Sequence, residues 1–129
     1  MTQTFRIDGT LPGLNNYTKA CRAGHHAGAA MKRRAEEVIV GCIRLAGLKP
    51  IAGQVTIHYT WIEPNKRRDL DNVCFARKFV QDALVTAGVL AGDGPKYIRG
   101  FSDEFMYDKE QPGVVVTVTD EEENVNDAD

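Results

Sequence analysis

Residues 55–61 place the clearest constraint on the fold, because apolar and polar side chains alternate there without interruption. Val55, Ile57, Tyr59 and Trp61 are separated by Thr56, His58 and Thr60. A strand points successive side chains to opposite faces of a sheet. The pattern therefore predicts a strand with one face buried on a core, ending at Glu63-Pro64.

Two other segments have the spacing of helices that could cover that buried face. In residues 29–45 and 72–87, apolar side chains recur every three or four positions. Gly47 and Pro50 are expected to end the first helix. Gly88 is expected to end the second, because glycine accepts the left-handed backbone found after helices.

The remaining segments predict further strands and a loop. Residues 4–7, 97–105 and 114–118 have strand character, whereas residues 11–17 read as a turn-rich loop. The order is then β-α-β-α-β-β. It predicts an α+β fold with a small mixed or antiparallel sheet and two main helices packed on it.

Length and charge indicate a single domain followed by an acidic C-terminal tail. A chain of 129 residues favours a single domain with its own core. The net charge of −2 is unevenly distributed, because residues 120–129 hold six acidic residues and no Lys or Arg. Residues 1–119 carry 16 basic residues against 12 acidic ones. We expect a mildly basic domain over 1–119 and a solvated, disordered acidic tail over 120–129.

The cysteines and the lack of long apolar runs favour a cytoplasmic protein. Cys21, Cys42 and Cys74 are scattered and form no CxxC pair, so we expect reduced thiols. No signal peptide or membrane-spanning stretch is predicted, and no membrane partner is expected. His25 and His26 near Cys21 are zinc-ligand types, but their spacing fits no tetrahedral set.

Charge is concentrated between the predicted strand and the second helix. Three consecutive cations, residues 66–68, directly precede Asp69 and Asp71, and Asp93 follows the helix in a glycine-bracketed loop. Carboxylate oxygens are suitable ligands for Mg²⁺, which keeps several waters and serves phosphate-bearing substrates. Clustered cations suit a phosphate backbone. The combination predicts metal-assisted phosphodiester chemistry on nucleic acid.

Each acid also has a purely structural interpretation. Asp69 or Asp71 could cap the second helix, although one cap accounts for only one of them. Asp93 alone is typical of a turn. A helix of 16 residues is about 24 Å long, so the chain must double back for the acids to meet. Asp93 would then lie at the start of a strand that returns beside residues 55–61.

The polar face of the second helix carries two charged residues in line with Asp71. Lys78 and Asp82 could form an ordinary surface pair at i,i+4 spacing. Alternatively, Lys78 points towards the metal site and stabilises charge on a phosphate. Phe75 on the same face is not explained by the core of one subunit, which leaves a partner contact or an isolated exposed ring as the alternatives.

Two groups of cations are candidates for contacts with DNA phosphates. No acidic residue occurs between Lys19 and Arg34, and the small residues at 24–30 predict a loop that could order on DNA. A solvated helix start is the alternative for this region. The candidates are Lys66, Arg67 and Arg68 beside the acids, and Lys19, Arg22, Lys32, Arg33 and Arg34 in a second patch.

These motifs together resemble a known family. The run Arg67-Arg68-Asp69-Leu70-Asp71-Asn72 is followed by Lys78, Asp82-Ala83-Leu84, Ala87-Gly88-Val89 and Asp93. This order is similar to the signature of RusA-type Holliday-junction resolvases, especially their phage-borne branch. Residues 11–17 and 31–37 also resemble that branch, and the similarity extends from about Arg6 to Val118.

The resemblance implies a homodimeric, Mg²⁺-dependent endodeoxyribonuclease of a bacterium or phage, acting in DNA recombination and repair. Such an enzyme resolves four-way DNA by paired nicks in opposing strands. Asp69, Asp71 and Asp93 would be catalytic acids and metal ligands, with Mn²⁺ as an alternative ion. Lys78 would be the catalytic lysine.

Two departures from the family pattern leave parts of this expectation open. The spacing from Asp71 to Lys78 is three residues longer than in the enterobacterial prototype, although phage relatives share it. Gly92 stands where the prototype has a further acid, so one or two metal ions are both compatible with the chain. Activity on flaps, D-loops or forks, and a non-catalytic DNA-binding role, are the alternative functions. Cleavage preference, dimer contacts and the role of the tail are not predicted.

Overall fold

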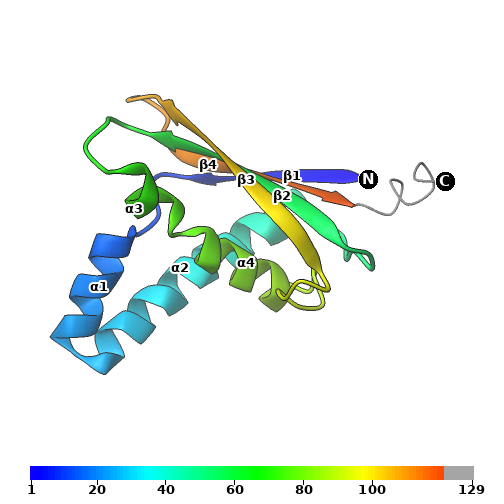
Figure 1. Cartoon of the computed structure of the whole chain (residues 1–129), viewed down its shortest axis with the longest axis horizontal. Helices are drawn as coiled ribbons and strands as arrows, with labels where there is room; N and C mark the ends of the chain where they lie inside the picture. The colour runs from blue at the N-terminus through cyan, green and yellow to red at the C-terminus, as the bar shows by residue number, and fades with distance from the viewer. Residues whose placement is uncertain (121–129) are drawn as a thin grey trace.

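A computed structural model describes residues 1–120, with the helices gathered on one face of a sheet and the other face open (Figure 1). The elements in chain order are β1 (Thr2–Asp8), α1 (Leu14–Ala23), α2 (His25–Ala46), β2 (Val55–Glu63), α3 (Leu70–Cys74), α4 (Arg77–Thr86), β3 (Ile98–Tyr107) and β4 (Gly113–Asp120). The predicted fold class, α+β with a mixed sheet, is confirmed.

The sheet has the strand order β1-β4-β2-β3. β4 is antiparallel to both β1 and β2, whereas β2 and β3 are parallel. A parallel pair needs a long crossover, and here α3 and α4 supply it. The strand that follows Asp93 lies beside β2, as predicted, but it runs parallel to β2, so the predicted doubling back that would bring Asp93 to Asp69 is wrong for a single chain. β3 forms one edge of the sheet.

The core lies between the sheet and helices α2 and α4. In β2 the odd-numbered residues are buried and the even-numbered ones are half-buried, so the predicted alternation is confirmed. Trp61 stacks on Tyr59 with ring centroids 5.3 Å apart, and its Nε1 donates to Asp103 Oδ1 at 2.8 Å. That bond satisfies the buried indole N–H. The helices contribute Ala35, Ile39 and Ile43 from α2 and Phe79, Val80, Ala83 and Leu84 from α4.

Two helical boundaries near the N-terminus differ from the prediction. Residues 14–17, predicted as part of a loop, begin α1, and α2 begins at His25 rather than at about residue 29. The expected loop of small residues at 24–30 is therefore mostly helix. Alanine is the best helix former, and Gly28 allows α1 to pack closely, since a Cβ there would lie 2.5 Å from Cys21 Sγ.

The predicted second helix is two helices, α3 and α4, separated at Phe75 and Ala76. Phe75 is half-buried, with its ring centroid 5.5 Å from that of Tyr17 in α1 and 5.6 Å from that of Phe79. The interpretation of Phe75 as unexplained by one subunit was wrong, because α1 of the same chain covers it. Gly88 follows α4 with a φ of 80°, as predicted.

The predicted acidic tail begins within the last strand. β4 continues through Asp120, one residue into the segment predicted as a tail. The rest of that segment, residues 121–129, lies outside the described residues.

Over residues 1–120, none of the helices has the length and apolar character needed to cross a membrane.

Substitution of two glycines by alanine tests the packing of α1 and α2. A Cβ on Gly13 would lie 2.5 Å from Asn72 Oδ1 and 2.8 Å from the Asn72 carbonyl oxygen, whereas one on Gly41 meets nothing within 4 Å. We expect Gly13→Ala to lower the free energy of unfolding by about 1–3 kcal/mol. Gly41→Ala in mid-helix should raise it by about 0.5–1 kcal/mol. Urea denaturation measures both, and equal effects would contradict this packing.

Candidate functional site

Asp69 and Asp71 lie at the exposed start of α3. Asp69 precedes the helix with an extended backbone, and its carbonyl oxygen accepts a hydrogen bond from Val73 N–H at 3.1 Å. Its side chain makes no capping hydrogen bond. Asp71 lies in the first turn and is also exposed. Helix capping by the side chain therefore does not account for Asp69, and both carboxylates face solvent.

Arg68 holds the segment before α3 in place through a buried ion pair. Its Nε and Nη2 donate to Glu63 Oε1 and Oε2, each at 2.9 Å, and its Nη1 donates to the Leu11 carbonyl at 3.1 Å. Glu63 is 7% exposed. A two-pronged pair of this kind fixes geometry as well as charge. Arg68, predicted as a DNA contact, is thus engaged in the fold.

The two cations before Arg68 differ from it in exposure. Lys66 and Arg67 are both exposed, and Lys66 Nζ lies 5.2 Å from the centroid of the Tyr107 ring. The Arg67 backbone N–H donates to Asn65 Oδ1 at 3.0 Å. These two side chains remain candidates for phosphate contacts beside Asp69.

Lys78 lies in a chain of ion pairs that joins α2, α4 and the loop before β3. Its Nζ is 3.2 Å from Asp82 Oδ1 and 3.5 Å from Asp93 Oδ2. Lys32 of α2 is 3.1 Å from the other oxygen of Asp82. The structure thus contains the helical i,i+4 pair and also brings Lys78 to Asp93. Lys32, predicted as a DNA contact, is paired here.

The charge of Lys78 is stabilised by its partners. The hydrogen bond to Asp82 is the main cause that raises the pKa of Lys78 above the ordinary 10.5, and Asp93 adds to it against the effect of burial. Lys78 is therefore protonated at neutral pH. The stabilisation by these pairs is present below the ordinary pKa and is lost as the pH rises through the raised one.

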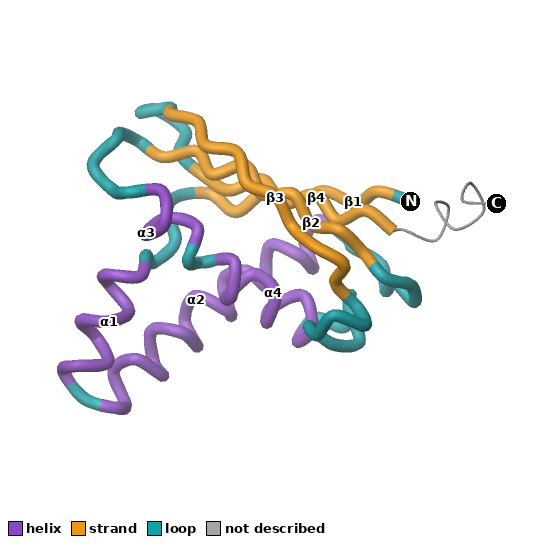
Figure 2. The backbone as a smooth tube through the Cα atoms, in the orientation of Figure 1, coloured by secondary structure: helices purple, strands orange, loops and turns teal. Residues whose placement is uncertain are grey.

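Asp93 lies away from Asp69 and Asp71 in one chain. Asp69 follows the end of β2, whereas Asp93 precedes the start of β3. These strands are parallel, in register from Val55 with Ile98 to Glu63 with Tyr107. Figure 2 shows the loop after β2 and the loop before β3 at opposite ends of the strands. Within residues 1–120, no group of three or more His, Cys, Asp or Glu side chains is placed to hold a metal ion.

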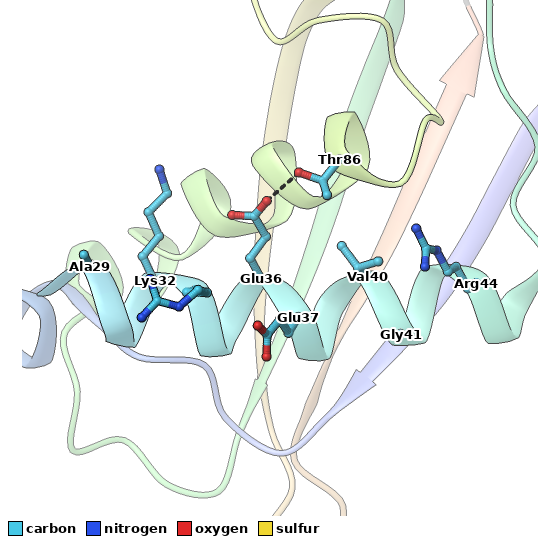
Figure 3. Close-up of a pocket in the computed structure, with 9 residues that line it drawn as sticks. Ala29, Lys32, Glu36, Glu37, Val40, Gly41, Arg44 and Thr86 are labelled. Atoms are coloured by element: carbon cyan, nitrogen blue, oxygen red, sulfur yellow. Dashed lines mark hydrogen bonds between the residues drawn. The ribbon is translucent and has the colours of Figure 1, made fainter. Parts of the chain in front are cut away.

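The second basic patch lies on α1 and the first half of α2. Lys19, Arg22, Arg33 and Arg34 are exposed, in contrast to the paired Lys32. A pocket of about 580 Å³ borders this patch between α2 and the end of α4. Figure 3 shows Lys32 and Glu36 pointing towards α4, with Thr86 donating a hydrogen bond to Glu36. Basic and acidic side chains both line this pocket, so it favours no single charge.

Three contacts that shape the site were not predicted from the sequence: Glu63 with Arg68, Asp82 with Lys32, and Tyr17 with Phe75. Glu63 had a usable signal, because it continues the inward-facing alternation of β2, and a buried carboxylate needs a cationic partner. The contact of Asp82 with Lys32 and the packing of Tyr17 on Phe75 had none, because they join segments 50 or more residues apart.

No protein-family model matches the chain, and no curated protein was found to be similar to it.

Proposed function

We propose that this protein is a metal-dependent endodeoxyribonuclease. The observation that carries the proposal is the exposed pair Asp69 and Asp71, neither of which is ion-paired in the described residues, on a segment fixed by Arg68. Lys66 and Arg67 beside this pair supply positive charge for a phosphate backbone. Hard carboxylate oxygens in such a place match the preference of Mg²⁺.

The particular activity proposed is resolution of Holliday junctions by paired nicks. The resemblance of residues 67–93 to RusA-type resolvases supports it, and so does the mildly basic body of the chain. Two identical active sites related by a two-fold axis would match the symmetry of a four-way junction. A homodimer is therefore part of the proposal.

Strand β3 is the proposed dimer contact, because it is a sheet edge with exposed apolar side chains. Phe101, Met106 and Tyr107 are 50%, 49% and 44% exposed. A long edge strand is a ready template for pairing with another chain. Antiparallel pairing of β3 across a two-fold axis would bring the start of one β3 to the end of the other. The partner subunit's Asp93 would then approach Asp69 and Asp71.

This arrangement assigns roles to the side chains of the chain. Asp69, Asp71 and the partner's Asp93 would hold Mg²⁺. When bound, the ion polarises the scissile phosphate and lowers the pKa of a bound water. Lys78 lies 3.5 Å from Asp93, so it would accompany that carboxylate to the site. There its charge would stabilise the developing negative charge on phosphate or on the leaving oxygen.

Cleavage of a synthetic four-way junction with Mg²⁺ tests the proposed activity. We expect the wild type to make paired nicks, and Asp71→Asn to lower the rate at least about a hundredfold while junction binding is retained. Asp8→Asn is the matched control, because Asp8 is an exposed acid paired with Arg6 on β1. Removal of the metal should abolish cleavage by both the wild type and the control.

Competition between DNA structures separates the proposal from its alternatives. Four-way junctions, flaps, D-loops and forks would be offered at equal concentration. Preferential cutting of flaps, D-loops or forks would replace the proposed substrate. A folded wild type that binds junctions but cuts nothing with Mg²⁺ or Mn²⁺ would instead be the non-catalytic DNA-binding protein.

A further inference from the structure

We propose that α1 and the first half of α2 form a DNA-binding arm whose tip, His25 and His26, stacks on bases that are unstacked at a branch point. The arm is defined as residues 14–35. This inference rests on the proposed function, because it takes branched DNA as the ligand. It adds a recognition element at the tip, which lies outside the acidic site, and it assigns the second basic patch to the same arm.

The arm projects from the body of the protein. Figure 1 shows the α1–α2 turn as the part of the helical layer farthest from the sheet. α1 contains no buried residue, and its main contacts are with α2 and α3. The outer surface of α1 therefore contributes little to the core and is available for contact with a large ligand.

The base of the arm is attached to the segment that carries the acids. The Asn15 backbone N–H donates to Asn72 Oδ1 at 2.9 Å, one residue beyond Asp71. The ring of Tyr17 packs on Phe75 and Phe79 with centroids 5.5 and 6.0 Å away. DNA held by the arm would thus have a fixed position relative to Asp69 and Asp71.

The charge on the arm is of one sign. Residues 9–35 contain five Lys and Arg residues and no Asp or Glu. Lys32 is paired with Asp82, and the other four are exposed. A projecting surface with unpaired positive charge suits a phosphate backbone, which supplies affinity without sequence preference. A basic or an apolar partner would not complement this charge.

The tip presents two adjacent rings to solvent. His25 and His26 are both exposed, and their ring centroids are 3.9 Å apart. The tip is also narrow, since Cys21 and Gly28 pack closely behind it. Exposed His rings are among the groups on which unstacked bases pack. Bases inside a duplex are stacked on both faces, whereas bases at the centre of an open branch point have a free face.

Binding without metal tests the tip separately from any cleavage. Fluorescence anisotropy in EDTA would compare binding to a labelled four-way junction, held in its open form without metal, with binding to a duplex of equal length. We expect His25→Ala/His26→Ala to weaken binding to the junction about tenfold and to leave duplex binding within about twofold. His58→Ala on the open sheet face is the matched histidine control. Equal weakening on both DNAs, or none, would overturn the role of the tip.

The charge of the arm has its own test. Arg22→Ala/Arg33→Ala should weaken binding to both DNAs and reduce the slope of log affinity against log salt by about 2. Lys109→Ala, an exposed lysine in the turn before β4, is the control and should leave the slope unchanged. An unchanged slope for the arginine variant would contradict the proposed role of the arm in binding DNA. Tighter binding of the wild type to an RNA junction than to the DNA junction would contradict it as well. Failure here with intact junction cleavage contradicts only the arm, whereas a wild type that neither binds nor cuts DNA contradicts the proposed function.

Discussion

Mixing Asp69→Asn chains with Asp93→Asn chains is expected to restore cleavage that neither variant has alone. The reason is the parallel pairing of β2 with β3, which places the two acids towards opposite ends of the sheet. If each site combines Asp69 and Asp71 with the partner's Asp93, a mixed dimer has one site with both substitutions and one site with neither. If each site uses one chain only, both sites of the mixed dimer are damaged.

The mixed dimers are expected to have a defined nicking rate and a defined product. Random exchange makes about half of the dimers mixed, each with one intact site, so the nicking rate should reach roughly a quarter of wild type. The mixed dimer should nick one strand of the junction rather than two opposing strands. Denaturing gel electrophoresis with each strand labelled in turn distinguishes these outcomes.

The matched control for this experiment is a mixture of Asp69→Asn with Asp71→Asn. These acids lie at the same end of one chain, so every site in the mixed dimer has lost a carboxylate under either arrangement. No activity is expected from it. Two affinity tags would verify that mixed dimers have formed. Verified mixed dimers of Asp69→Asn with Asp93→Asn that remain inactive would refute the shared site.

Arg68→Met is expected to destabilise the fold by about 3–5 kcal/mol, the largest effect on stability that we anticipate for a single polar residue here. The substitution leaves the Glu63 carboxylate, whose side chain is 10% exposed, without its cation. It also removes a donor from the Leu11 carbonyl. A charge left buried and unpaired costs far more than the pair itself contributes.

Urea denaturation of three variants tests this explanation. Arg67→Met changes the neighbouring exposed arginine and should alter the free energy of unfolding by no more than about 0.5 kcal/mol. Glu63→Met/Arg68→Met removes both charges and should recover much of the loss. If the double variant is as unstable as Arg68→Met, the cost comes from lost packing and not from the unpaired carboxylate.

Much of the fold could be predicted from patterns that span a few residues. Alternation over residues 55–61 predicted β2, and Gly88 predicted the end of the crossover helix. The β3 and β4 segments were also located within a few residues. These features depend on periodicity and on local backbone preference, which a short stretch of sequence expresses directly.

The boundaries that could not be predicted depend on contacts between distant segments. The run Leu14-Asn15-Asn16-Tyr17 reads as a turn, yet it is helical because Asn72 and Phe75 hold it from the other side. Helical stability in proteins comes mainly from tertiary packing, so weak local signals give way to it.

For the candidate site, the sequence by itself determined which acids and cations are neighbours along the chain. It placed Asp69 and Asp71 together behind three cations. Only the tertiary structure decided that Arg68 pairs with Glu63, that Lys78 reaches Asp93, and that Asp93 lies away from the other two acids. The physical reason is that strand direction in the sheet sets which ends of the chain meet, and a parallel crossover separates residues that a hairpin would have joined.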